Sequence, residues 1–161
     1  MRKTAVSLLL LILSGTLLSS TVLSSTLPPP PSVKQPAPPD SGERQKARTL
    51  YLLVRGVNRR LAWDGCLALK ALIRAKQLVN KGYFDHEDPA TGKNPAWAIV
   101  RQCFPCSCAG ENLAMGMGTA ENVHKALMNS PTHRKNILDP RFSRIGIACY
   151  DYVCVELFAG F

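Results

Sequence analysis

The sequence predicts one small domain of mixed α/β class, and three features of its 161 residues indicate this. Apolar residues recur at three- and four-residue steps in the first half of the domain, which is the spacing of amphipathic helices. Near the C-terminus, apolar and polar residues alternate, which is typical of strands with one buried face. A proline-rich segment precedes both regions and marks where the domain begins.

Residues 1–26 are expected to be a signal peptide or an N-terminal anchor. Arg2 and Lys3 precede a long apolar run, which is the pattern of an export signal. The apolar residues within 5–23 approach the length that a membrane-spanning helix needs, so cleavage and anchoring both stay open. The expected location is therefore outside the cytoplasm, either secreted or tethered to a membrane.

Residues 27–47 are expected to form an extended linker. Seven prolines lie between Pro28 and Pro39, and they remove the backbone donors that a packed element needs. The folded domain is then expected at residues 48–161. A domain of this size buries a modest core, which covalent cross-links would reinforce.

Five helices are expected in the domain. The first lies within residues 48–61, and the second begins after Asp64 and ends at Gly82, because these residue types cap helices at those ends. The expected starts of the other three are Asn94-Pro95, Thr119 and Ser130-Pro131. His133 then falls in the first turn of the last helix.

Two strands are expected in the C-terminal segment, where apolar residues alternate on either side of Asp151-Tyr152. If the strands form a hairpin over these two residues, Cys149 lies opposite Cys154. The two would occupy a non-hydrogen-bonded pair, in which side chains approach most closely. We therefore expect a disulfide between Cys149 and Cys154.

The remaining four cysteines allow three pairings, and the sequence leaves the choice open. An even number of cysteines in an exported chain favours disulfides. The Cys-x2-Cys-x-Cys run also fits a zinc site, and one of the four could instead be a buried thiol. These residues are Cys66, Cys103, Cys106 and Cys108.

The formal net charge of +9 favours anionic partners such as lipid headgroups or wall polymers, with solubility alone as an equal alternative. Nucleic acid is not expected as a partner, because the basic residues are scattered and export removes that target. A monomer is expected.

Three segments each carry a side chain able to bind a proton or a metal. "GYFDH" ends at His86, "AGENLAMG" contains Glu111, and "NSPTHRKNIL" contains Ser130 and His133. Each residue alone has an ordinary structural explanation. Together, two imidazoles and one carboxylate can hold a divalent cation such as zinc, or share protons in a hydrogen-bonded network.

The order of these motifs resembles that of the CAP superfamily of cysteine-rich secretory, antigen-five and pathogenesis-related proteins, in its short bacterial form. The resemblance covers about residues 50–161 and implies an α-β-α sandwich with a central antiparallel sheet and an open cleft. The cleft of the family gathers two histidines and two glutamates. By motif, His86, Glu111 and His133 supply three of these, whereas Ser130 stands in place of the second glutamate.

The resemblance favours a non-enzymatic binding domain for a lipid, a glycan or an envelope component in this cleft, with no required cofactor. One alternative is a metal-dependent hydrolase that uses His86, Glu111 and His133, although the missing carboxylate weakens it. Another is a protein-interaction module in which residues 87–95 contact the partner. Ser130 is expected to cap its helix, not to act as a nucleophile.

Overall fold

The computed structural model describes residues 40–161. The predicted signal or anchor segment, and the linker as far as residue 39, lie outside the described residues. Within the described part of the chain, no helix is both long and apolar enough to span a bilayer. The elements in chain order are α1 (Ser41–Val57), β1 (Ala62–Trp63), α2 (Gly65–Lys81), α3 (Ala96–Arg101), β2 (Cys108–Met115), α4 (Ala120–Asn129), α5 (Pro131–Leu138), β3 (Arg144–Tyr150) and β4 (Val153–Gly160).

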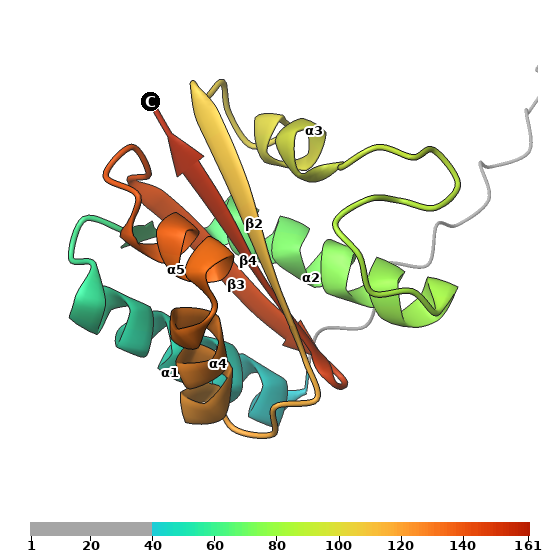
Figure 1. The fold of residues 1–161 in the computed structure, drawn as a ribbon, viewed down its shortest axis with the longest axis horizontal. Helices are drawn as coiled ribbons and strands as arrows, with labels where there is room; N and C mark the ends of the chain where they lie inside the picture. The colour runs from blue at the N-terminus through green and yellow to red at the C-terminus, as the bar shows by residue number, and fades with distance from the viewer. Residues whose placement is uncertain (1–39) are drawn as a thin grey trace, which may run out of the picture. The chain divides into compact units, whose positions relative to one another are not determined.

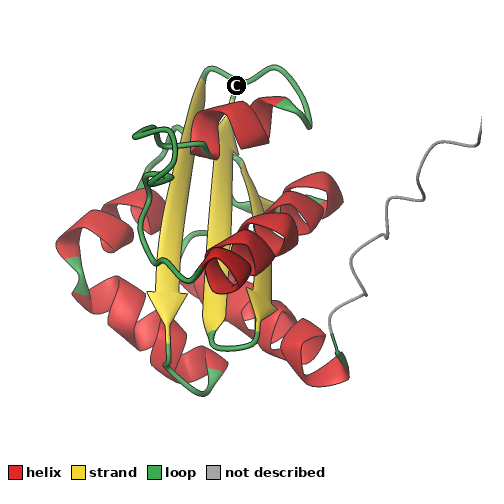
Figure 2. Ribbon diagram, turned by 90° about the vertical axis from the view of Figure 1, so that its right-hand side faces the viewer, coloured by secondary structure: helices red, strands yellow, loops and turns green. Residues whose placement is uncertain are grey.

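The strands form one sheet in the order β1-β3-β4-β2, and helices cover both of its faces. α1, α4 and α5 lie on one face, while α2 and α3 lie on the other (Figure 1 and Figure 2). The strand side chains divide accordingly between two apolar clusters, because successive residues of a strand point to opposite faces. The expected α-β-α sandwich is therefore confirmed.

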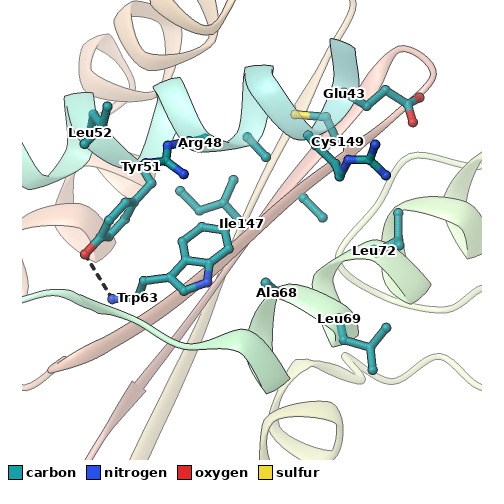
Figure 3. A pocket seen from close by; sticks show the side chains of 13 residues that line it. Glu43, Arg48, Tyr51, Leu52, Trp63, Ala68, Leu69, Leu72, Ile147 and Cys149 are labelled. Carbon is teal, nitrogen blue, oxygen red and sulfur yellow. Dashed lines mark hydrogen bonds between the residues drawn. The ribbon is translucent and has the colours of Figure 1, made fainter. Parts of the chain in front are cut away.

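The two edges of the sheet differ. β2 pairs with β4 along its whole length, whereas β1 is only two residues long and pairs in parallel with the first two residues of β3. The hydroxyl of Tyr51 in α1 accepts a hydrogen bond from the N–H of Trp63 at 3.0 Å, as Figure 3 shows. Because β1 pairs only with Arg144 and Ile145, β3 has no neighbouring strand on its β1 side beyond Ile145 among the described residues.

The first helix begins at Ser41, so the prediction that the linker extends to residue 47 is wrong. Asp40 and Glu43 form a capping box: Asp40 Oδ1 accepts from the N–H of Glu43 at 2.7 Å, and Glu43 Oε2 accepts from the N–H of Asp40 at 3.3 Å. These contacts satisfy two donors that the first turn would otherwise leave free. Ala47 already lies in the core.

The predicted ends of α2 are confirmed. Asp64 Oδ1 accepts from the N–H of Leu67 at 3.0 Å, and Gly82 ends the helix with a φ of 68°, a conformation that glycine adopts without strain. Thr119 likewise caps α4, accepting from the N–H of Asn122. Local sequence signals therefore place these helices well.

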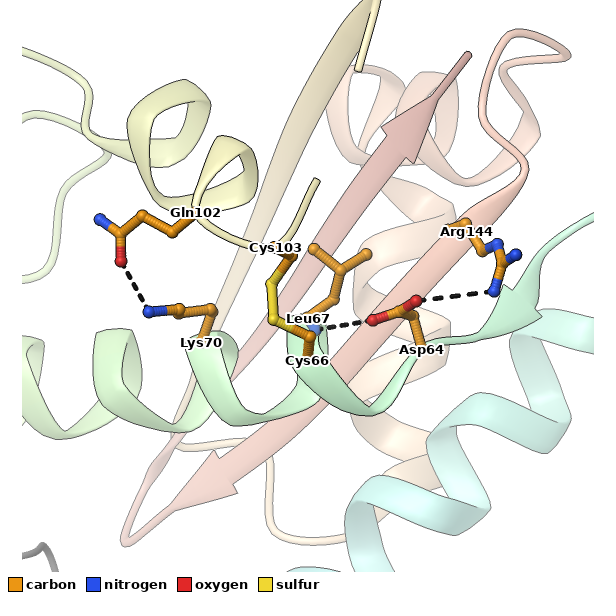
Figure 4. The surroundings of a disulfide bond; sticks show 7 residues. All are labelled: Asp64, Cys66, Leu67, Lys70, Gln102, Cys103 and Arg144. Carbon is orange, nitrogen blue, oxygen red and sulfur yellow. Dashed lines mark hydrogen bonds and ion pairs between the residues drawn. A yellow bond between two sulfur atoms is a disulfide. The ribbon is translucent and has the colours of Figure 1, made fainter. Parts of the chain in front are cut away.

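Two disulfides brace the domain. Cys149 and Cys154 lie opposite each other on β3 and β4 and are bonded, as expected. A second bond joins Cys66 of α2 to Cys103, just after α3, and so fastens α3 to the longer helix (Figure 4). Lys70 and Gln102 reinforce this junction with a 2.6 Å hydrogen bond.

Cys106 and Cys108 are free thiols. Cys106 packs with the cluster under α2 and α3, whereas Cys108 packs with the cluster on the other face. Their side chains therefore point to different faces of the sheet, which explains why they do not pair. Cys103 of the Cys-x2-Cys-x-Cys run is bonded to Cys66, and among residues 40–161 no group of three or more His, Cys, Asp or Glu side chains is arranged to hold a metal.

Removing each disulfide is expected to lower the free energy of unfolding by a different amount. The bridges span sequence separations of 37 and 5 residues, for which loop-closure entropy gives about 4 and about 2 kcal/mol respectively. Urea denaturation of Cys66→Ser with Cys103→Ser, and of Cys149→Ser with Cys154→Ser, measures both losses.

The matched control for this series is Cys106→Ser combined with Cys108→Ser, which removes two thiols and no bond. We expect it to change the free energy of unfolding by less than about 1 kcal/mol. A loss in the control as large as that from either bridge would contradict the assignment of free thiols.

Candidate functional site

The three predicted site segments meet at the edge strand β2. Glu111 lies on β2 and points towards α2, and His86 comes from the loop that follows α2. His86 Nδ1 lies 2.9 Å from Glu111 Oε1. His133, from α5 on the other face, places its ring 6.3 Å from that of His86. The structure therefore brings His86 and Glu111 into direct contact and sets His133 beside His86.

Arg74 was not predicted to belong to the site. It lies on the buried face of α2 and is completely inaccessible to solvent. Its Nε is 3.1 Å from Glu111 Oε2, and its Nη1 donates to the hydroxyl of Tyr83 at 2.7 Å. Its Nη2 donates to the main-chain oxygens of Asp85 at 2.8 Å and His86 at 3.1 Å.

The signal for Arg74 was present in the sequence. The residue falls three positions after Ala71 and four before Leu78, within the apolar stripe of the helix. A cation is almost never fully buried without a partner, so its position alone required a carboxylate nearby. Arg74 holds both Glu111 and the backbone of the loop that carries His86, and it explains why the "GYFDH" and "GEN" segments lie together.

The pKa values of the two imidazoles are shifted in opposite directions. The hydrogen bond that His86 donates to the carboxylate of Glu111 is the largest effect on His86 and raises its pKa, although partial burial works against this. The pKa of His133 is lowered, first by burial and then by the neighbouring His86. A proton therefore binds at His86 before it binds at His133.

A second polar network holds α5 against the other side of β2. Asn112 Nδ2 donates to Glu156 Oε2 at 2.9 Å and to the main-chain oxygen of His133 at 3.1 Å. Asn136 Nδ2 donates to Asn112 Oδ1 at 2.9 Å and to the main-chain oxygen of Glu111 at 3.2 Å. These bonds fix the position of His133 relative to the sheet.

Glu156, on β4, is a buried carboxyl that no sequence pattern singled out. Its Oε1 has no hydrogen-bond partner. Burial raises its pKa to about 7, although the hydrogen bond from Asn112 acts in the opposite direction. A carboxyl in an apolar core favours its neutral form because an ion loses hydration there.

Ser130 precedes Pro131 at the start of α5, but its side chain does not make the expected capping bond. Instead, its Oγ lies 2.9 Å from His133 Nδ1 and 3.3 Å from Thr132 Oγ1. Because His133 curls back over the first turn, it competes with the backbone for this hydroxyl. Ser130 therefore orients the imidazole, and its expected capping role is corrected accordingly.

The proposed metal ligands His86, Glu111 and His133 do not form a group able to hold a metal among the described residues. Both carboxylate oxygens of Glu111 are engaged, Oε2 by Arg74 and Oε1 by His86. A cation at this position would have to compete with a buried guanidinium that is never deprotonated. The arrangement suits a proton-sharing network better than a metal centre.

An apolar groove of about 590 Å³ lies at the opposite edge of the sheet, between α1 and α2 (Figure 3). It exists because β1 is too short to cover β3 beyond Ile145. Its lining includes Trp63, whose ring packs edge-on against Tyr51 with centroids 5.2 Å apart. The other lining residues are Glu43, Arg44, Ala47, Arg48, Leu52, Ala68, Leu69, Leu72, Ile147, Ala148 and Cys149.

The rim of the groove exposes apolar side chains. Leu52 of α1 is 60% exposed and Leu69 of α2 is 56% exposed. In the sequence, these leucines lie outside the buried stripe of their helices. This position could have indicated an exposed apolar surface here. None of His86, Glu111 or His133 lines it.

Known proteins resemble this chain in both sequence and fold. The family model for CAP, the cysteine-rich secretory protein family, matches residues 55–155. YkwD of Bacillus subtilis (strain 168) is 42% identical over 84 residues, which amount to 52% of this chain and 32% of that protein. The chain therefore spans about a third of the length of this curated relative.

Two solved structures are similar to this chain in fold. An extracellular protein with an SCP domain from Bacillus anthracis has a TM-score of 0.68 at 26% identity, over 79% of this chain and 45% of that one. An outer surface protein of Borrelia burgdorferi has a TM-score of 0.63 at 22% identity, over 73% of this chain and 93% of that one. At that identity, the second likeness shows the fold alone.

Arg74→Met is expected to lower the free energy of unfolding by about 3–5 kcal/mol, because it leaves Glu111 buried without its cation. Adding Glu111→Gln removes that stranded charge and should restore more than about 1 kcal/mol. Urea denaturation of the single and double variants measures both effects. A single variant as stable as the parent, or a double variant with no recovery, would contradict the role assigned to this pair.

Glu156→Gln is expected to flatten the dependence of stability on pH. The pKa of Glu156 rises on folding from 4.5 to about 7, so its stabilising neutral form is complete below pH 4.5 and lost as the pH rises through 7. The loss by pH 8 is on the order of 3 kcal/mol. Denaturation of both proteins at several pH values tests this, and identical pH profiles would refute it.

Proposed function

This chain belongs to the CAP family of cysteine-rich secretory proteins, and from that premise we propose that it is a non-enzymatic binding domain that acts outside the cytoplasm. Its ligand is an anionic amphiphile, whose apolar chain enters the groove between α1 and α2. The observation that carries this proposal is the apolar groove itself, with its exposed leucine rim.

The groove has the size and lining of a small-molecule site. Its volume of about 590 Å³ falls within the range of pockets that bind small ligands. Ile147 and Leu72 form part of an apolar floor, and Leu52 and Leu69 extend the apolar surface outwards. An alkyl chain gains free energy from leaving water and requires no hydrogen bonds, so it suits such a lining.

The charge beside the groove selects an anionic headgroup. Arg44 and Arg48 both line the groove from α1, and side chains four residues apart share one face of a helix. The carboxylate of Glu43 is engaged by the backbone N–H groups of Asp40 and Asp151. We assign the headgroup contact to the guanidinium of Arg48, because both carboxylate and phosphate match its geometry.

The network of His86, Glu111 and His133 supports a non-enzymatic role. Glu111, its only carboxylate from the family tetrad, is engaged on both oxygens, and Ser130 replaces the second. A fully satisfied polar network stiffens a fold without any contact to a ligand. We therefore assign the ligand to the groove, and the hydrolase and metal interpretations of the cleft stay untested predictions.

The location is proposed from the relatives together with the N-terminal sequence. The Bacillus anthracis protein is described as extracellular and the Borrelia burgdorferi protein as an outer surface protein. The first 26 residues carry the pattern of an export signal. Lipid and other envelope amphiphiles are available to a protein in that location.

The groove is tested by titrating the purified full-length chain with dodecyl phosphate, laurate and dodecanol below their micelle concentrations. Trp63 lines the groove, and its fluorescence is the readout in a Trp97→Phe background, which removes the second tryptophan of the chain. Leu52→Glu and Leu69→Glu are each expected to weaken binding of both anions at least tenfold, because they place a charge where the alkyl chain lies. Arg48→Gln should weaken the anions more than dodecanol.

The matched control is Val57→Glu, which adds the same charge to an exposed residue of α1 that does not line the groove. It should leave all three affinities within about twofold, a change of roughly 0.4 kcal/mol. No saturable binding of any probe, or equal effects of Leu52→Glu and Val57→Glu, would overturn the proposal.

A further inference from the structure

A second surface lies at the end of the sheet where α1 and α5 finish. Residues 55–64 run from the end of α1 through β1, and residues 135–144 run from the second half of α5 to the first residue of β3. Asn58 Nδ2 donates to the main-chain oxygen of Ile137 at 2.8 Å, and Ala62 pairs with Arg144. Figure 1 shows the loop after α1 and the orange loop between α5 and β3 on the same side of the molecule.

These two segments hold an excess of positive charge. They contain six cations and only two carboxylates, and each carboxylate is already matched to one arginine. Asp64 lies 3.6 Å from Arg144, and Asp139 lies 2.6 Å from Arg141. Four positive charges remain in excess. The six cations, which we call the basic end, are Arg55, Arg59, Arg60, Lys135, Arg141 and Arg144.

The cations of the basic end are presented to solvent on a fixed backbone. Apart from the half-buried Arg55, all are exposed. Arg55 Nη1 donates to the main-chain oxygens of Arg59 at 2.7 Å and Leu61 at 3.2 Å. Asn58 ties the same loop to α5 from the other side. Because the loop is already ordered, binding through it would cost little conformational entropy.

We propose that the basic end binds a linear envelope polymer whose negative charges are phosphodiester groups. The cations come from separate segments and spread across one end of the sheet, so they suit repeated charges along a chain better than one small ion. Five of the six are arginines, whose planar fork matches phosphate oxygens. None of them lines the α1–α2 groove, so this surface goes beyond the proposed amphiphile site.

The test measures binding of the full-length chain to fluorescent synthetic poly(glycerol phosphate) by polarisation, at salt concentrations from 50 to 200 mM. Arg59→Glu combined with Arg60→Glu is expected to weaken binding at least tenfold. Arg59→Gln with Arg60→Gln should weaken it less and make its salt dependence shallower, because two phosphate contacts are lost. Binding of dodecyl phosphate at the groove should not change.

The matched control is Lys93→Glu with Lys125→Glu, which makes the same change of net charge at exposed residues outside the basic end. We expect it to weaken polymer binding less than threefold. Equal losses from the two double variants would overturn the proposal, because net charge alone would then govern binding. It would also be overturned by tighter binding to anionic vesicles, or by equal binding to polyglutamate, whose charges are carboxylates.

Discussion

The buried guanidinium of Arg74 is the constraint on which the rest of the polar architecture depends. A cation without access to water is tolerated only if its charge is balanced and each of its nitrogens is hydrogen-bonded. Arg74 meets this requirement with Glu111, the hydroxyl of Tyr83 and two main-chain oxygens of the loop after α2. Because one side chain supplies all these contacts, helix, loop and edge strand are held in a single arrangement, and His86 is placed as a consequence.

The edge strand β2 is held from both faces by different chemistry. On one face, the ion pair between Arg74 and Glu111 holds the strand. On the other, Asn112 and Asn136 hold α5 through neutral hydrogen bonds that end at the buried carboxyl of Glu156. The rings of His86 and His133 lie beside each other at this strand, and the pKa of His86 is raised whereas that of His133 is lowered. The positions of both histidines are thus explained by the way two helical layers are fastened to one strand.

The opposite edge of the sheet, at β1 and β3, is shaped by the shortness of β1. β1 covers only the start of β3, so α1 and α2 leave an apolar groove between them where a longer strand would have packed. The proposed amphiphile site and the network of His86, Glu111 and His133 are therefore on opposite edges, and the basic end occupies a third position where α1 and α5 finish. This separation allows each proposed site to be altered without touching the others.

The sequence by itself determined the features that depend on neighbours along the chain. Helical periodicity and the capping residues Asp64 and Gly82 placed α2, and the alternation around a two-residue turn set the hairpin register that pairs Cys149 with Cys154. The capping box that starts α1 at Ser41 was also local, and it was overlooked within the proline-rich segment. The order of the motifs indicated the family and its sandwich fold.

Only the tertiary structure decided which distant residues share a space. The ion pair of Arg74 with Glu111, the pairing of Cys66 with Cys103 and the burial of Glu156 each join segments far apart in sequence. Spacing reports the face on which a residue lies but not the element that packs against that face. The partner of a buried charge, and therefore its pKa, depends on that packing, so it could not be obtained from the sequence alone.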